Sequence, residues 1–343
     1  MRAAVVREFN EDLSIETLSD PICPDDGVVL EVEACGVCRS DFHGWTGGHP
    51  KVSNGSVLGH EYCGTVIAAG PRATDAIGDR LIAPFILGCG KCAACHTGVS
   101  NTCPSQIVPG FGTPGAYAEY VAVPFDHNLV HLPETMAPAL AAGLGCRVTT
   151  AWHALTDRAQ VRAGEWVAVH GTGGVGLSAL LLAKMLGAQV VVVDVVDEKL
   201  EHAKSLGADA AVNATDGNAA EAIREISGGG AQVSIEALGI AATTNASIDC
   251  LAILGRHVHV GMPSGDGMME INMRGIYSKQ LSFYGTRGMP SWKYPALLDM
   301  IARGAVDLSP MVAREIRLED ASGELRAMHG PTAPGTAVIT TFT

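Results

Sequence analysis

Cysteine and histidine residues that could bind a metal ion gather in two parts of the sequence. The first part comprises Cys38, His60 and, much further along the chain, Cys146. The first two stand in polar runs, Gly36 to His43 and Gly59 to Glu61, whose density of reactive side chains is hard to explain as packing. Two thiolates and one imidazole make a zinc site with its fourth position open to water or substrate. We therefore predict a catalytic zinc site.

The second part is a run of four cysteines at short spacings with glycines between them. Four thiolates complete the tetrahedral shell of a structural zinc ion. Disulfides are less favoured in a chain of this size without an export signal, whereas an iron–sulfur cluster is an alternative that spacing alone does not exclude. We predict that this second, structural zinc is bound by Cys89, Cys92, Cys95 and Cys103.

A glycine-rich turn follows an apolar strand at Trp166 to His170 and precedes a helical run from Leu177 to Leu186. Such glycines let the backbone approach a pyrophosphate at the helix N-terminus. The next strand ends in Asp194, at the distance expected for an acid that binds both ribose hydroxyls and repels a 2′-phosphate. NAD is therefore favoured over NADP, on a turn made of Gly171, Thr172, Gly173, Gly174, Val175 and Gly176.

Two kinds of element must position these residues. Antiparallel strands are expected through residues 1–35, 61–83 and 112–132, and two small-residue helices at 136–144 and 146–152. Strands and helices then alternate, which predicts six parallel strands in a doubly wound sheet. Besides those at 166–170 and 190–194, strands are placed near 210–213, 232–236, 256–261 and 281–284, with helices near 197–206, 218–227, 241–252 and 290–303. Tail strands near 311–316 and 336–341, around a helix near 319–328, should return to the first domain.

Length and composition are typical of a soluble enzyme with two domains. The chain has 343 residues, of which 47% are hydrophobic and 17% charged. A formal net charge of -13 argues against nucleic acid or an anionic membrane as partner. The sequence shows no signal peptide or membrane-spanning run, so a cytoplasmic location is expected. Four further cysteines are read as buried small hydrophobes: Cys23, Cys35, Cys63 and Cys250.

In combination these motifs resemble the zinc-dependent medium-chain alcohol dehydrogenases of the medium-chain dehydrogenase/reductase superfamily, over nearly the whole chain. The motifs are GVCRSDFH at 36–43, GHE at 59–61, the four-cysteine run, GCRVTT at 145–150 and GTGGVG at 171–176. The resemblance implies an α/β protein with a GroES-like, mostly-β catalytic domain at 1–147 and a Rossmann NAD-binding domain at 148–285. Residues 286–343 would then complete the catalytic domain.

The resemblance also implies roles at the zinc site. It makes Cys38, His60 and Cys146 the catalytic zinc ligands, with Glu61 beside them as an occasional alternative ligand. Asp41 would be the hydrogen-bond partner of His60. Ser40 and His43 would form a proton relay through the nicotinamide ribose.

For the cofactor, the resemblance implies contacts from Arg39 to the pyrophosphate, from Thr150, Val260 and Gly261 near the nicotinamide, and from Lys199 to the adenosine ribose. Many relatives carry a pyrophosphate-binding arginine near the C-terminus, where this chain has Thr336. Arg39 or Arg287 is expected to compensate. The walls of the substrate pocket are expected to be Trp45 and Phe85.

The function that follows is reversible oxidation of an alcohol to an aldehyde or ketone by hydride transfer to NAD. Within the same superfamily, a polyol, sugar or threonine dehydrogenase would use the same residues. A zinc-stabilised sensor that binds NAD(H) without catalysis is the alternative from another class. The partner is a small molecule, and the resemblance implies a homotetramer.

Overall fold

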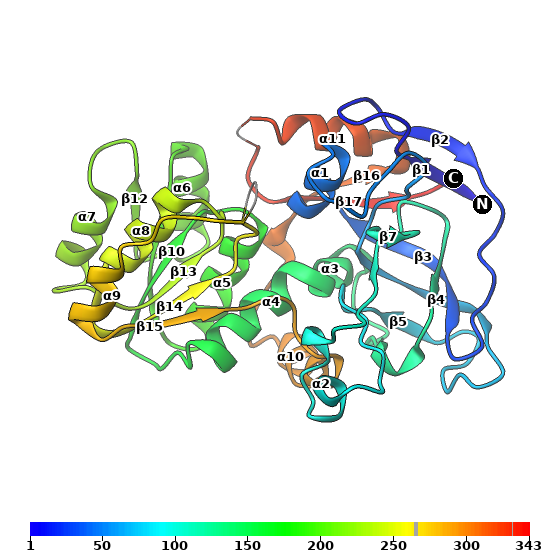
Figure 1. Cartoon of the computed structure of the whole chain (residues 1–343), viewed down its shortest axis with the longest axis horizontal. Helices are drawn as coiled ribbons and strands as arrows, with labels where there is room; N and C mark the ends of the chain where they lie inside the picture. The colour runs from blue at the N-terminus through cyan, green and yellow to red at the C-terminus, as the bar shows by residue number, and fades with distance from the viewer. Residues whose placement is uncertain (264–266, 331) are drawn as a thin grey trace.

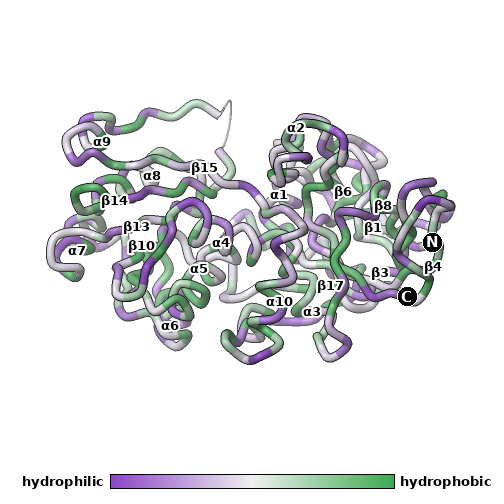
Figure 2. The backbone as a smooth tube through the Cα atoms, turned by 90° about the horizontal axis from the view of Figure 1, so that it is seen from below, coloured by the Kyte–Doolittle hydropathy of each residue, from purple (hydrophilic) through white to green (hydrophobic). Residues whose placement is uncertain are grey.

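The computed structural model describes the whole chain except residues 264–266 and 331. Two lobes lie side by side along the long axis of the molecule (Figure 1). Both termini lie in the same lobe, at the end furthest from the other one (Figures 1 and 2). Every described helix is too short or too polar to cross a membrane.

One lobe is built on a sheet of six parallel strands, as predicted. Its middle strands are apolar on both faces, and Val190 to Val193 are all buried, which suits a sheet covered by helices on both sides. The strands expected near 210–213, 232–236 and 281–284 lie within one residue of those observed. Across the sheet the order is β12 (Ala210–Asn213), β11 (Gln189–Asp194), β10 (Trp166–His170), β13 (Ala231–Glu236), β14 (Leu251–His259) and β15 (Ser282–Gly285).

Helices alternate with these strands along the chain (Figure 1). One of them, α9 (Met273–Lys279), was not expected from the sequence; the side-chain oxygen of Asn272 caps it by accepting a hydrogen bond from the Gly275 N–H. The others are α5 (Gly174–Met185), α6 (Asp197–Ser205), α7 (Ala219–Ile226) and α8 (Ala241–Asp249). The doubly wound fold is thus confirmed.

The boundary between α8 and β14 differs from the prediction. The helix was expected to reach residue 252 and the strand to begin near 256, but α8 ends at Asp249 and β14 begins at Leu251. The apolar run that follows Asp249 is equally compatible with the end of a helix and with a strand. In the structure it belongs to a strand with a bulge, where Leu254 has φ 61 and the pairing with β13 shifts register.

The other lobe is mostly β-structure, as expected. Its larger sheet is antiparallel except where β16 and β17 run parallel, and shorter strands close its surface. In order, the sheet contains β16 (Val312–Arg317), β17 (Thr336–Thr341), β3 (Val28–Gly36), β4 (Glu61–Ala69), β5 (Arg80–Ile82) and β9 (Val130–His131), with β8 (Tyr120–Val123) on β3. Two small pairs are β1 (Arg2–Val5) with β2 (Ser14–Thr17), and β6 (Val108–Pro109) with β7 (Gly112–Thr113).

The C-terminal segment joins the lobe that holds the N-terminus. After α10 (Tyr294–Ala302), the two tail strands flank α11 (Ala321–Ala327), close to the positions predicted for them. Strand β17 pairs with β3 at Val338↔Gly36 and Ile339↔Cys35. The tail therefore supports the backbone that leads directly into Cys38.

A continuous helical segment connects the two lobes where two separate helices were expected. It runs from α3 (Pro138–Gly143) into α4 (Thr149–His153), with π-helical turns at Leu144–Val148 and Ala154–Arg158. A π turn inserts an extra residue into a helix and is frequent at functional sites. Cys146 lies in the first of these turns and is buried.

The four cysteines without an assigned role are not all buried. Cys35, Cys63 and Cys250 are completely enclosed, as predicted, and burial raises the pKa of each thiol. Cys23 is only half-buried, which corrects the prediction for that residue. It precedes Pro24 in the irregular segment before β3, outside any strand. All ten cysteines are free thiols.

Candidate active site

Cys38 lies at the point where a strand of the mostly-β lobe turns into a helix. Strand β3 ends at Gly36, and Cys38 is the N-cap residue of α1 (Arg39–Trp45). The carboxylate of Asp41 accepts a hydrogen bond from the Cys38 backbone N–H at 3.0 Å, which fixes this turn. A side chain at Gly36 would meet Glu61 Oε2 at 2.4 Å, so glycine is required for the strand to pass the site.

His60 is held by the same carboxylate. Asp41 Oδ1 lies 3.0 Å from His60 Nδ1 and accepts a hydrogen bond from the Gly59 N–H at 3.1 Å. Because Asp41 fixes Nδ1 as the protonated nitrogen, Nε2 carries the lone pair. Nε2 is buried and has no hydrogen-bond partner among the described residues. An unpaired imidazole nitrogen of this kind is the natural ligand of a zinc ion.

Four potential ligands converge at this point. One donor atom from each of Cys38, His60, Glu61 and Cys146 lies within 4.8 Å of the other three. They come from the start of α1, the start of β4 and the π turn, which are far apart in the sequence. Two sulfurs, one unpaired nitrogen and a nearby carboxylate fit the requirements of zinc.

The electrostatics of the cluster favour the binding of a metal cation. The neighbouring Cys146 thiol lowers the pKa of Cys38 well below its ordinary value, and the same contact raises the pKa of Cys146. Burial lowers the pKa of His60, but the negative charges of Asp41 and Cys38 together raise it. Cys38 is thus the readiest thiolate of the group, and a thiolate is the form that binds metal.

Glu61 has an ion-pair partner that the sequence analysis did not predict. Arg147, next to Cys146, forms a buried ion pair with Glu61 and also donates from Nη2 to the Val37 carbonyl. Burial raises the pKa of Glu61, and the positive charge of Arg147 opposes that shift. An arginine within the otherwise apolar run Leu144–Val148 was the signal in the sequence, because a buried charge requires a counterion.

The four-cysteine run forms a separate closed lobe. The Sγ atoms of Cys92 and Cys95 are 3.5 Å apart, and those of Cys92 and Cys103 are 3.7 Å apart. Cys92 caps the short helix α2 (Ala93–His96), and all four sulfurs lie within 4.8 Å of one another. The backbone N–H of Lys91 lowers the pKa of Cys89 to about 6. Four sulfurs without another donor fit a structural zinc ion.

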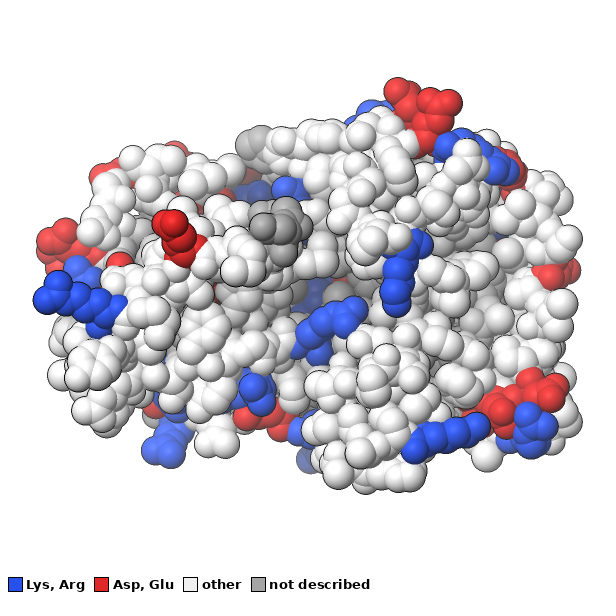
Figure 3. Space-filling view, in the orientation of Figure 1, with Lys and Arg blue, Asp and Glu red and all other residues white. Residues whose placement is uncertain are grey.

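A cleft of about 610 Å³ opens from the first cluster toward the six-stranded sheet. Figure 3 shows this face of the molecule hollowed between the lobes, with Lys and Arg side chains around the hollow. The predicted residues that line the cleft are Cys38, Arg39, Ser40, His43, His60, Phe85, Cys146, Thr150, Val175, Val260, Gly261 and Arg287. The cleft therefore connects the metal ligands with the start of α5.

The structure corrects the assignment of Trp45 as a pocket wall. Trp45 is completely buried, and its Nε1 donates to the Glu11 carbonyl instead of facing the cleft. The residue that lines the cleft after α1 is His49, whose ring lies 4.5 Å from Phe111. Its position in the glycine- and proline-containing turn at 47–50, a few residues after the polar run Gly36 to His43, was the available signal.

The glycine-rich turn is tied to Asp194 across two strands. Asp194 Oδ2 accepts from the Thr172 N–H at 2.8 Å and from the Thr172 hydroxyl at 2.6 Å, and Oδ1 accepts from the Val195 N–H at 2.8 Å. Gly171 has φ +92, and a side chain there would meet Leu238 at 2.9 Å. The acid thus already supports the turn on which a dinucleotide would lie.

The other predicted cofactor residues do not all line the cleft. The Thr150 hydroxyl accepts from the Gly288 N–H at 3.2 Å, while Lys199 lies on α6, outside the cleft lining. Arg39 contacts the Met328 carbonyl, and its guanidinium lies 4.6 Å from the Phe42 ring.

Neither arginine that was expected to compensate for the C-terminal one lies against the glycine-rich turn. Arg287 donates to Gln106 at 2.6 Å and lies over Phe85. The residue packed against Gly174 is Arg147, whose Cδ would be 3.0 Å from a Cβ at that position, with Thr336 beside it at 3.4 Å. Arg147 is thus the arginine that packs against Gly174 in this turn, while its guanidinium is paired with Glu61.

Comparisons with known proteins agree with this arrangement. Residues 24–134 match the model of the alcohol dehydrogenase GroES-like domain, and residues 174–303 match that of the zinc-binding dehydrogenases. An alcohol dehydrogenase of Geobacillus stearothermophilus is 35% identical over 89% of this chain and 90% of its own. A D-arabitol-phosphate dehydrogenase of Enterococcus avium is 27% identical over 90% of this chain and 89% of its own.

The solved structures show the same relationship. A crystal structure of an NAD-dependent alcohol dehydrogenase superposes with a TM-score of 0.91 at 30% identity, covering 100% of both chains. Sequence, fold and donor set together support alcohol oxidoreduction of the zinc type. This chain belongs to the zinc-dependent medium-chain dehydrogenase/reductase family.

Proposed function

We propose that this protein oxidises an alcohol to an aldehyde or ketone, and catalyses the reverse reduction, by hydride transfer to and from NAD. The observation that carries the proposal is the unpaired, buried Nε2 of His60 beside Cys38 and Cys146, at one end of a cleft that also contains Val175 of α5. A metal ligand set and a dinucleotide turn on one cleft are what this reaction requires.

Cys38, His60 and Cys146 would hold the catalytic zinc, with Glu61 as the nearby carboxylate. A zinc ion there would polarise the alcohol oxygen and lower its pKa toward neutrality. Asp41 orients His60, and Arg147 keeps Glu61 in place by its ion pair. The second zinc would lie in the four-cysteine lobe, which has no opening to the cleft among its described residues.

The proton from the alcohol leaves through the protein. Ser40 lies beside the ligand, with its Oγ 3.9 Å from Cys38 Sγ, and both Ser40 and His43 line the cleft. Burial and the charge of Arg39 lower the pKa of His43, so its imidazole is neutral and can accept a proton at neutral pH. Ser40 would pass the proton to His43, which delivers it to solvent.

The cofactor assignment follows from Asp194. A carboxylate at the end of β11 pairs with ribose hydroxyls and repels a 2′-phosphate. NAD would displace at least part of the hydrogen bonding that Thr172 now makes with this acid. Lys199, on the following helix, would assist at the adenosine ribose.

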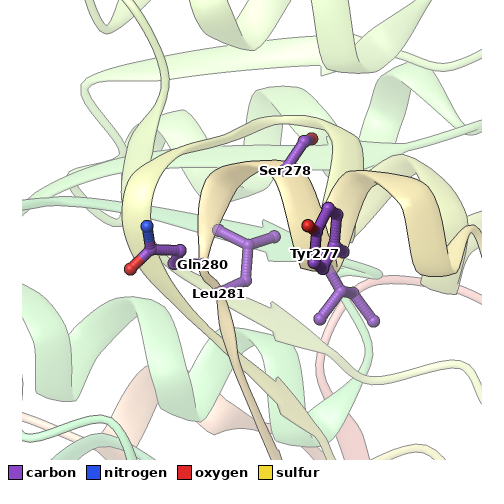
Figure 4. Close-up of a pocket in the computed structure, with 5 residues that line it drawn as sticks. Tyr277, Ser278, Gln280 and Leu281 are labelled. Carbon is purple, nitrogen blue, oxygen red and sulfur yellow. The ribbon is translucent and has the colours of Figure 1, made fainter.

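Assembly as a homotetramer, with pairs formed through the free edge of the six-stranded sheet, completes the proposal. We place this pairing at β15, one of the two edge strands of that sheet, because Ile253, Leu254 and Phe283 near it are exposed apolar residues. Figure 4 shows the shallow hollow of Tyr277, Ser278, Gln280 and Leu281 beside the same edge. It contains no titratable pair or metal ligand, so we assign it to assembly and not to catalysis.

The test is NADH formation, followed by absorbance, with a panel of primary, secondary and polyol alcohols. The proposal predicts turnover with NAD that exceeds turnover with NADP. NAD binding without oxidation of any alcohol would favour the sensor alternative. Preference for a polyol would place the protein with relatives such as the D-arabitol-phosphate dehydrogenase.

A further inference from the structure

The active-site cleft has a charge opposite to that of the protein as a whole. The chain contains 36 acidic against 23 basic residues, yet no aspartate or glutamate is found among the described residues that line the cleft. Its lining instead contains Arg39, Lys51 and Arg287 together with His43 and His49. Within the described part of the chain, none of these three cations forms an ion pair with a carboxylate.

Three of these residues gather on the side of the cleft formed by the mostly-β lobe. The Lys51 N–H donates to His49 Nδ1 at 3.2 Å, so the two belong to one turn. Arg287 approaches from the segment after β15, where Gln106 Oε1 accepts its hydrogen bond at 2.6 Å. All three residues line the same cleft, and burial together with the charges of Lys51 and Arg287 lowers the pKa of His49.

This cluster lies one aromatic ring away from the metal ligands. The Phe111 ring is 5.4 Å from the His60 ring and 4.5 Å from the His49 ring. Phe85 lies 5.9 Å from His60, and the Arg287 guanidinium is 5.3 Å from the Phe85 ring. A molecule with its hydroxyl at the metal site and a short carbon chain between the two rings would bring its far end to this cluster.

The cofactor does not account for the cluster. Its phosphates are placed at the start of α5, where Arg147 lies against Gly174 and where Arg39 is available on the same cleft. His49, Lys51 and Gln106 belong to segments of the mostly-β lobe around Phe111, beyond His60. Positive charges that line one cleft without a carboxylate partner among the described residues would be relieved by a bound anion.

We propose that His49, Lys51 and Arg287 bind an anionic group of the substrate, so that the preferred substrate is a small alcohol bearing a phosphate or a carboxylate. The inference rests on the proposed alcohol oxidation and adds its substrate class. Arg287 presents a fork of donors that suits either anion, and Lys51 adds a mobile charge. Phe85 and Phe111 would enclose the carbon chain.

Matched pairs of substrates test this inference. Glycerol is compared with glycerol 3-phosphate, and 1,3-butanediol with 3-hydroxybutyrate, so that each pair differs mainly by the anion. At low ionic strength we expect kcat/KM to favour the anionic member of at least one pair by about tenfold or more, and the preference to shrink with added salt. Equal values, or better use of the neutral members in both pairs, would overturn the inference.

Variants identify the residues responsible. Lys51→Met and Arg287→Met should each lower the ratio of kcat/KM for the anionic substrate to kcat/KM for its neutral counterpart by about tenfold. Arg274→Met is the matched control, because Arg274 is an exposed arginine on α9, remote from the cleft lining. An unchanged preference in both cleft variants would contradict the assignment.

A binding measurement separates this inference from the proposed function. Inorganic phosphate and, separately, acetate are titrated calorimetrically into the zinc-loaded enzyme saturated with NADH, which fills the cofactor phosphate site. Binding of either anion that is weakened about tenfold in the Lys51→Met/Arg287→Met variant supports the cluster, even if no alcohol is oxidised. Oxidation of neutral alcohols without anion binding would contradict this inference and would still support the proposed function.

Discussion

The two clusters of metal-binding residues in this protein are built on opposite plans. The four-cysteine lobe takes all its donors from residues 89–103, and every donor is a sulfur. The cluster of Cys38, His60, Glu61 and Cys146 takes mixed donors from segments more than a hundred residues apart and borders a cleft. The first plan needs only its own loop, whereas the second exists only once the whole mostly-β lobe and the helical connection have folded.

Their surroundings differ in the same way. The four-cysteine lobe is supported by a few external contacts, such as the Trp292 Nε1–H donated to the Gly98 carbonyl at 2.8 Å. The open cluster is surrounded by charged side chains, since Asp41 holds His60 and Arg147 holds Glu61. A closed metal site thus mainly stabilises its own segment, while an open one depends on charges that also serve the chemistry.

The sharpest way to separate the two clusters is to remove one thiolate from the open one. Cys38→Ser should reduce kcat by about 10³-fold or more, because a weakened metal site no longer polarises the alcohol. The melting temperature should change little, since Cys38 caps a short helix and closes no loop. Substantial turnover by Cys38→Ser with full zinc content would show that Cys38 is not a required ligand of the catalytic zinc.

The matching change in the closed lobe is Cys92→Ser. It should lower the melting temperature by about 5 °C or more, because a structural metal contributes folding energy that the variant loses. The activity of the protein that remains folded should stay near that of the wild type. Scanning calorimetry and activity per folded molecule check both statements. A variant as stable as the wild type would show that the lobe holds no structural metal.

Arg147 gives the open cluster a role in folding stability as well as in the chemistry. Arg147→Met should destabilise the fold by about 3–5 kcal/mol, since it leaves the buried Glu61 without a counterion. The double variant Arg147→Met/Glu61→Gln is the matched control and should recover much of that loss. Denaturant unfolding measures both. An equal loss in the single and double variants would mean that Arg147 acts through packing alone.

The smallest expected effect concerns His43 and depends on pH. Because burial and Arg39 lower its pKa, the imidazole is a neutral base at pH 7 and becomes protonated only at more acid pH. His43→Gln should therefore slow alcohol oxidation most near neutral pH, by about 10²-fold. The deficit should shrink at high pH, where hydroxide and buffer replace the relay, and added imidazole should restore part of the rate.

The pre-steady-state burst of NADH is the quantity to follow in His43→Gln, because product release can hide a slower proton step. A deficit of the same size at every pH, with no recovery by imidazole, would remove His43 from the relay.

Local patterns explain why much of this fold could be predicted. The buried run Val190–Val193 can only be a strand covered on both faces, and the short cysteine spacings fix a closed loop whatever surrounds it. The predicted boundaries of helices and strands were wrong where one sequence pattern is compatible with two structures. The apolar residues after Asp249 continue a helix equally well, and only pairing with β13 makes them a bulged strand.

The site was harder to predict because its geometry depends on contacts between distant segments. Trp45 and His49 stand close together in the sequence, and only the turn after α1 decides which one is buried and which faces the cleft. The ion pair of Arg147 with Glu61 joins the start of β4 to a π turn that no periodic pattern reveals. The charge of the cleft likewise appears only when Lys51 and Arg287 are brought together.

The most direct test of the two-site account is the zinc content of freshly purified protein, measured by elemental analysis together with chelator sensitivity. If the chain has two separate zinc sites, the wild type should contain two zinc ions per chain and a Cys38→Ser/His60→Ala variant one. The remaining ion of that variant should resist a chelator that inactivates the wild type. One zinc ion per chain in the wild type, or iron in place of zinc, would contradict the account.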